Sequence, residues 1–300
     1  MKRYGAALAA LLSLGGPGLV AAQQQGLKVF ISADMEGVTG AVTDEQLGPA
    51  GFEYGRFREF MTAEVLAAIE GARAAGATEL VIADAHGNGQ NLLLERLPED
   101  ALVVRSWPRP LMMMEGIDST FDAAILIGYH SATTNPRGVR AHTISSARLA
   151  GVSLNGRPAA ESTISAAIAG HFGVPVVLIS GDDAAVEELQ DLVGDVEAAV
   201  VKRALSFHSA ATLTPAAGAR LIRERAEAAL RRLGDFQPFR LNAPIRLDLT
   251  FKNYRPAEVL AYLPIVERLD AHTIRYTADD MIAVSLFLEF VMTYEPGLVP

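Results

Sequence analysis

The chain has 300 residues, half of them hydrophobic, which is enough for one large or two modest domains with a substantial core. It contains no cysteine, so disulfides and thiolate-bound metals are excluded, and any metal must be held by His, Asp or Glu. With 35 acidic and 26 basic residues the formal net charge is −9, and no basic cluster offsets it. This charge argues against a nucleic acid as partner.

The first 22 residues have the pattern of a signal peptide. Lys2 and Arg3 precede an Ala/Leu-rich run over 4–19, and small residues up to Ala22 offer a cleavage site. An uncleaved anchor is the alternative, but glycines and a proline interrupt the run, which is short for a membrane span. No other stretch approaches the ~20 apolar residues of a spanning helix, and no lipobox cysteine is present. We therefore expect an exported, periplasmic or extracellular protein without a stable membrane anchor after cleavage.

The first predicted strand covers residues 27–34 and ends in two carboxylates. Asp34 and Glu36 are two positions apart, so on an extended chain they point to the same side, and Gly37 then breaks the strand. Two like charges held this close repel each other unless a cation or a shared proton lies between them. The alternative is an acidic strand end that faces water.

Two further predicted strands end in histidines. After a loop over 38–51 and a helix over 53–75, the strand at 80–84 leads into His86. A short strand at 102–104 follows, and then the strand at 123–128, which ends next to His130. Taken alone, His86 could be an exposed loop histidine.

Each of these three predicted strands places a possible metal ligand just past its carboxyl end. The carboxyl ends of neighbouring parallel strands share one edge of a sheet, and ligands bind at that edge. Oxygen and imidazole ligands suit zinc or a similar divalent metal. The pattern therefore predicts a metal site built from Asp34, Glu36, His86 and His130.

The middle of the chain continues the alternation of strands and helices. A polar loop over 131–139 leads to His142, and Asn155-Gly156 indicates a tight turn. Glu161 opens a predicted helix over 162–172, where a carboxylate could simply compensate the helix dipole. The next predicted elements are a strand at 174–179, a helix at 184–192 capped by Asp182 or Asp183, a strand at 196–201 and a helix at 215–233.

The composition changes to that of a linker over 235–244. Beyond it we predict a half-buried strand at 245–251, a strand at 266–276 with His272 in its middle, and an apolar helix at 280–292. The predicted fold class is α/β, with a mostly parallel sheet flanked by helices. The predicted divisions are a signal peptide at 1–22, a metal-binding catalytic domain at 23–235 and a smaller C-terminal α+β region at 236–300.

Several motifs in a fixed order carry a family resemblance from about residue 27 to the end. They are Ser32-Ala33-Asp34-Met35-Glu36-Gly37, Asp84-Ala85-His86, Gly128-Tyr129-His130, Gly138-Val139-Arg140-Ala141-His142, Asn155-Gly156 followed by Glu161, Gly181-Asp182-Asp183, Val201-Lys202 and Thr214-Pro215. The chain resembles the DppA-type D-aminopeptidases, a family of zinc metallopeptidases. The predicted export signal is a departure, because the well-known member of that family is cytoplasmic.

The resemblance implies a complete set of site residues. It implies metal ligands at Asp34, Glu36, His86, His130 and Glu161, which together hold two divalent ions, zinc in this family, with Asp34 as the bridging carboxylate. It gives His142 a direct catalytic role as base or nucleophile. It also implies a homo-oligomer, since the family forms a ring-built decamer that encloses its active sites.

The expected function is that of an exported di-zinc aminopeptidase that removes N-terminal D-amino acids from short peptides or amides. One alternative is a di-metal amidohydrolase acting on a non-peptide or L-configured amide. Another is a metal-dependent binding protein without turnover. The candidate proton shuttle His142 argues against the binding protein, because an imidazole with an unperturbed pKa of ~6.5 is suited to proton transfer.

Overall fold

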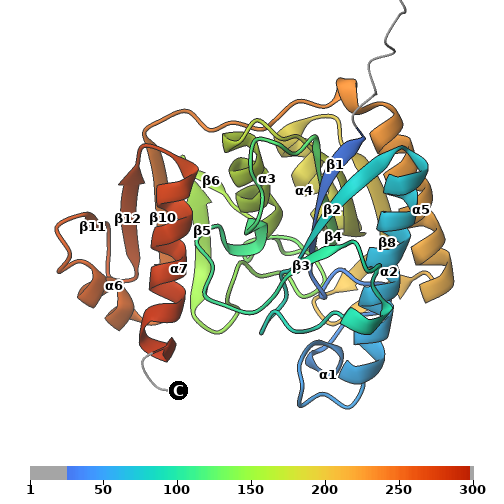
Figure 1. Cartoon of the computed structure of the whole chain (residues 1–300). Coiled ribbons are helices and arrows are strands. Elements are labelled where there is room, and N and C mark those ends of the chain that lie inside the picture. The colour runs from blue at the N-terminus through green and yellow to red at the C-terminus, as the bar shows by residue number, and fades with distance from the viewer. Residues whose placement is uncertain (1–25, 298–300) are drawn as a thin grey trace, which may run out of the picture.

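The computed structural model describes residues 26–297, so the predicted signal peptide lies outside the described residues (Figure 1). Within that range, none of the helices is both long enough and apolar enough to serve as a membrane span.

A seven-stranded sheet forms the larger part of the molecule, in the order β3-β2-β1-β4-β7-β8-β9 (Figure 1). Its strands are β1 (Leu27–Ala33), β2 (Ala77–Asp84), β3 (Leu102–Val104), β4 (Ala123–Tyr129), β7 (Val176–Asp182), β8 (Glu197–Ser206) and β9 (Ser209–Thr212). All neighbouring pairs are parallel except the β8–β9 hairpin. The prediction of an α/β fold with a mostly parallel sheet is confirmed.

Helices cover both faces of this sheet, which explains why its central strands are continuous apolar runs. Successive side chains of β1 enter different cores: Ile31 packs with α2 (Tyr54–Ala74) and α5 (Pro215–Arg231), and Phe30 packs on the face of α3 (Glu161–His171) and α4 (Asp183–Val193). The helices α2 and α5 approach closely at Gly71, where a Cβ atom would lie 2.3 Å from the carbonyl oxygen of Arg223.

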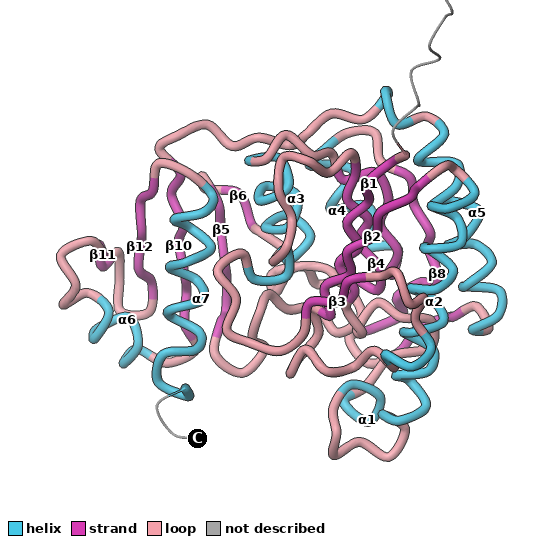
Figure 2. Tube along the Cα trace, in the orientation of Figure 1, coloured by secondary structure: helices cyan, strands magenta, loops and turns pink. Residues whose placement is uncertain are grey.

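A second sheet of five antiparallel strands lies on the far side of α3, as Figure 2 shows. Its order is β11-β12-β10-β5-β6, from β5 (Leu149–Leu154), β6 (Arg157–Pro158), β10 (Ile245–Phe251), β11 (Val266–Arg268) and β12 (Thr273–Ala278). The hairpin of β5 and β6 comes from the middle of the chain and joins the C-terminal strands through β5–β10 pairing. The division of the chain at residue 235 stays a prediction.

Most predicted helices agree with the structure. The bounds of α2, α3, α4 and α5 lie within two residues of the prediction, whereas α7 (Met281–Gly297) extends five residues further. Asp182 is the N-cap of α4, and its side chain accepts a hydrogen bond from Ala185 N at 2.8 Å. The remaining helical segments are α1 (Asp44–Leu47), α6 (Tyr254–Leu260) and the 3-10 turns Leu94–Arg96, Met112–Met114 and Leu233–Asp235.

The prediction of a single strand over residues 266–276 is wrong. A turn divides it into β11 and β12, and His272 lies in that turn rather than in the middle of a strand. The carboxylate of Asp270 accepts hydrogen bonds from the backbone N–H groups of His272 (2.7 Å) and Thr273 (2.8 Å). These side-chain to backbone bonds compete with the strand ladder and favour a turn.

Candidate metal centre

The carboxyl ends of β1, β2 and β4 meet at one edge of the parallel sheet. In the register of these strands, Ala33 at the end of β1 pairs with Asp84 of β2 and with Ile127 of β4. Asp34, His86 and His130 therefore follow their strands at nearly the same level. The predicted gathering of strand-end side chains is present in the structure.

Two glycines let the ends of β1 and β4 approach each other closely. Gly37 N–H donates to the carbonyl oxygen of Gly128 at 2.7 Å, and a Cβ atom on Gly37 would lie 2.1 Å from the carbonyl oxygen of Tyr129. Gly128 has a φ of +71°, in the left-handed region that favours glycine. This contact brings the loop of Asp34 and Glu36 against the segment that carries His130.

The first group of candidate ligands is Asp34, Glu36 and His86, whose ligand atoms lie within 4.8 Å of one another. His86 Nδ1 is 2.8 Å from Glu36 Oε2 and 3.2 Å from Asp34 Oδ1. All three residues are buried, so these charges are largely removed from water.

The second group is His130, His142 and Glu161, with ligand atoms again within 4.8 Å of one another. Glu161 Oε1 lies 3.4 Å from His130 Nε2 and 3.7 Å from His142 Nε2. The imidazole rings of His130 and His142 stack with their centroids 4.0 Å apart. Asp34 connects the two groups, because its Oδ2 atom is 3.2 Å from His130 Nε2 while its Oδ1 atom faces His86.

Each histidine has one ring nitrogen beside a backbone carbonyl. His86 Nε2 lies 2.6 Å from Leu47 O, His130 Nδ1 lies 3.1 Å from Ser131 O, and His142 Nδ1 lies 2.9 Å from Arg140 O. A proton on that nitrogen leaves the other nitrogen with a lone pair directed at the carboxylates. A carbonyl partner of this kind is typical of metal-binding histidines, since it fixes the tautomer and the ring orientation.

The electrostatics of the centre also favour a cation. Burial and the nearby charge of Glu36 raise the pKa of Asp34. Burial by itself lowers the pKa of His86 and of His130, but the neighbouring carboxylates outweigh it and raise both. Asp34 Oδ2 and His130 Nε2 are buried without a hydrogen-bond partner although they face each other. Three carboxylates and three imidazoles arranged in this way fit divalent ions such as zinc.

The structure brings together all six residues that were singled out from the sequence. The position of Glu161 had rested on the family resemblance alone, and α3 begins there with its side chain in the second group. His142 also lies within the second group, but its Nε2 atom is further from the carboxylates than the nearest ring nitrogen of either other histidine, at 3.7 Å from Glu161 and 3.9 Å from Glu36.

Two residues that hold the loops of the metal centre were not recognised in this role from the sequence. Asp182 was expected only as a helix cap, but its Oδ2 atom also accepts a hydrogen bond from Val139 N (2.7 Å), in the loop that leads to His142. Lys202 belongs to the Val201-Lys202 motif of the resemblance, which gave it no role, and the structure buries it against the loop of Glu36. Both contacts join residues far apart in the sequence, for which no local pattern exists.

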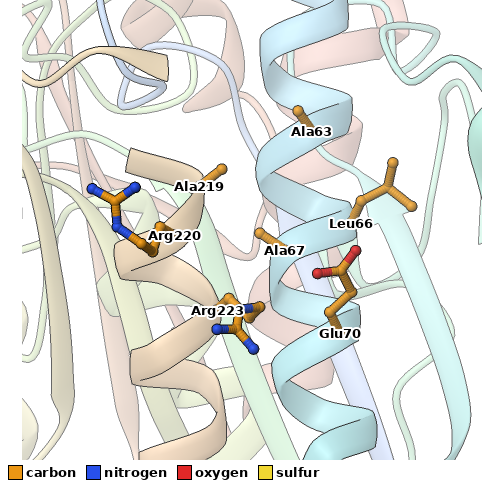
Figure 3. A pocket seen from close by; sticks show the side chains of 7 residues that line it. All are labelled: Ala63, Leu66, Ala67, Glu70, Ala219, Arg220 and Arg223. Atoms are coloured by element: carbon orange, nitrogen blue, oxygen red, sulfur yellow. The ribbon is translucent and has the colours of Figure 1, made fainter. Parts of the chain in front are cut away.

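A shallow pocket of about 280 Å³ lies away from this centre, between α2 and α5 (Figure 3). Its lining includes Glu70, Arg220 and Arg223 but none of the six candidate site residues. This pocket is therefore separate from the candidate metal centre.

Comparison with known proteins agrees with this geometry. A curated D-aminopeptidase of Bacillus subtilis (strain 168) is 34% identical over 262 residues, which cover 85% of this chain and 93% of that protein. The solved structure of the Zn-dependent D-aminopeptidase DppA from Bacillus subtilis, described as a self-compartmentalizing protease, superposes with a TM-score of 0.84 at 30% identity. That similarity covers 91% of this chain and 99% of the other.

The family match extends over nearly the whole described chain. Residues 27–290 match the D-aminopeptidase family, a span that includes both candidate ligand groups. The chain belongs to the D-aminopeptidase family and is a metallo-aminopeptidase.

Proposed function

We propose that this protein is an exported di-zinc aminopeptidase that removes N-terminal D-amino acids from short peptides. The observation that carries the proposal is that Asp34 lies between two sets of buried candidate ligands, Glu36 with His86 on one side and His130 with Glu161 on the other. The solved relative is described as Zn-dependent, which supports zinc as the metal.

The donor atoms divide naturally between two ions. Glu36 and His86 would hold the first ion and His130 and Glu161 the second, while the two oxygens of Asp34 face both groups. Zinc ions held there would polarise a scissile carbonyl and lower the pKa of a water molecule from ~15.7 towards ~7.

His142 is the residue that we assign to proton transfer. Its side chain is 15% exposed, more than any other member of the centre, so a substrate can reach it. Its Nδ1 atom is fixed by Arg140 O, and its Nε2 atom points towards Glu36 and Glu161 at 3.9 and 3.7 Å. This nitrogen can take a proton from the attacking group and deliver it to the leaving amine, as general acid–base catalysis requires.

The variant His142→Ala tests this role. We expect it to keep its zinc and to lose activity by at least about 100-fold, the lower range of general acid–base contributions. Zinc content by plasma emission spectroscopy and hydrolysis rates would be measured on the same preparation. A variant with near wild-type turnover would show that the proton is carried by another group.

The substrate proposal is tested with a pair of mirror-image dipeptides. The protein should contain about two zinc ions per chain, one for each ligand group, and should release D-alanine from D-Ala-D-Ala but not L-alanine from L-Ala-L-Ala. Hydrolysis of the L-peptide or of a non-peptide amide would favour the amidohydrolase alternative. Bound zinc without hydrolysis of any amide would favour a metal-dependent binding protein.

Export and assembly complete the proposal. The pattern of residues 1–22 supports secretion into the periplasm or the medium, and fractionation of the producing cells tests it. The relative's description as a self-compartmentalizing protease supports a homo-oligomer, with a decamer as the expected size. Light scattering on the purified protein measures that size directly.

A further inference from the structure

Lys202 is a buried lysine whose ammonium group is surrounded by backbone carbonyls. It lies on β8, and only 2% of the residue is exposed. The Nζ atom donates to the carbonyl oxygens of Glu36, Val38 (3.1 Å) and Ala41 (2.6 Å). An ammonium group has three protons, so each can serve one of these carbonyls.

The three carbonyls belong to the turn that follows β1. This turn has few bonds of its own: Val38 N donates to Met35 O at 3.1 Å, and Ala41 N donates to Val38 O at 3.0 Å. Without the ammonium group, the buried carbonyl oxygens of Glu36 and Ala41 would lose this partner, whereas Val38 O would keep its bond from Ala41 N. Each unsatisfied buried group is costly. Lys202 therefore contributes strongly to the shape of this turn.

The charge of Lys202 is balanced by carboxylates from several elements. Burial disfavours a charged amine, and the charges of Asp182, Glu64, Glu36 and Asp34 oppose this effect. Asp182 pairs with Lys202 across β7 and β8, and Glu64 comes from α2. The ammonium group thus lies where three parts of the fold meet, directly behind the backbone of Glu36.

The side chain of Glu36 points away from this contact and into the metal centre. Its carbonyl oxygen binds Lys202, while its carboxylate lies 2.8 Å from His86 Nδ1. Because the two groups belong to one residue, a displaced carbonyl also displaces the carboxylate. Shifts of well under 1 Å are enough to weaken a metal site whose ligands must be held precisely.

We propose that Lys202 is a positioning residue, which holds the Glu36–Ala41 turn so that the carboxylate of Glu36 is presented to the metal. This inference rests on the proposed metal-dependent function, but it concerns the protein before metal binds. It assigns Lys202 no contact with substrate.

The test replaces Lys202 by methionine in the full chain, which keeps the length of the side chain and removes the ammonium group. The matched control is Lys28→Met, because Lys28 lies at the opposite end of β1 and its Nζ atom donates to Thr120 Oγ1 at 2.7 Å. Two quantities are measured: the zinc affinity by competition with a chelator, and the hydrogen exchange of residues 35–41 in the zinc-free protein.

We expect Lys202→Met to bind zinc at least about 10-fold more weakly than the wild type and to exchange the turn amides faster even without zinc. Lys28→Met should match the wild type in both. A folded Lys202→Met with unchanged zinc affinity and unchanged exchange overturns the inference. If the wild type itself binds no zinc, the proposed function fails, and faster exchange of the turn would still distinguish the role of Lys202.

A second variant covers the case in which Lys202→Met does not fold. Lys202→Gln keeps a donor for the carbonyls and should fold with intermediate exchange and intermediate zinc affinity. If neither variant folds while Lys28→Met does, Lys202 serves the stability of the whole sheet, and its assignment to the turn is wrong.

Discussion

Glu64 offers the clearest quantitative prediction, because it is a buried carboxylate outside the metal centre. It lies on α2 with 1% exposure, and its Oε1 atom accepts a hydrogen bond from Thr39 N at 2.9 Å. Burial raises the pKa of Glu64 from its ordinary value of 4.5 to about 7. The folded protein therefore keeps this proton at pH values where the unfolded chain has lost it.

The direction of the pH effect on stability follows from the number of protons that each state binds at Glu64. Between pH 4.5 and 7 the folded state holds more protons at Glu64 than the unfolded state does, so its contribution to stability falls as the pH rises and levels off above the folded pKa. At 1.36 kcal/mol for each pKa unit, the loss between pH 5 and pH 8 is about 2.5 kcal/mol. Glu64→Gln keeps an oxygen acceptor for Thr39 N and removes the titration.

The assay is denaturant unfolding of the zinc-free wild type and of the variant at both pH values. The free energy of unfolding of Glu64→Gln, relative to wild type, should rise by about 2.5 kcal/mol from pH 5 to pH 8. The control is Glu59→Gln, on the exposed side of the same helix, which should give nearly the same difference at both pH values. A change for Glu64→Gln below about 0.5 kcal/mol, within the error of such measurements, would refute the reasoning.

Three further substitutions test the centre and its support. Glu36→Gln removes a charge that faces His86. The zinc content after dialysis should therefore fall, and the activity should drop by more than about 100-fold. Full zinc occupancy of this variant would contradict the place of Glu36 in the centre. Asp182→Asn leaves one oxygen for two backbone donors, Val139 N and Ala185 N, so we expect a loss of about 2 kcal/mol in unfolding experiments and a lower kcat at unchanged zinc content. Gly37→Ala would place a Cβ atom 2.1 Å from the carbonyl oxygen of Tyr129. This clash should lower the free energy of unfolding by about 3 kcal/mol in denaturant experiments. Wild-type stability of the variant would show that the ends of the two strands can separate freely.

The sequence by itself determined the parallel sheet and the strand-end ligands. Runs such as Val29–Ile31 and Ile125–Ile127 are short and apolar, and they appear as buried parallel strands because local pattern is sufficient to specify such elements. Once the strands are parallel, their carboxyl ends must share an edge. The convergence of Asp34, Glu36, His86 and His130 therefore follows from local pattern and one topological rule.

Only the tertiary structure decided which distant segments complete and support that edge. Glu161 enters the centre because α3 is placed between the two sheets, and β5 pairs with β10 across about ninety residues of chain. Lys202 and Asp182 bind the backbones of remote loops, and neither contact has a sequence pattern, since any loop offers the same N–H and C=O groups. Periodicity records which side of an element is buried, whereas the identity of the partner depends on how the whole chain packs.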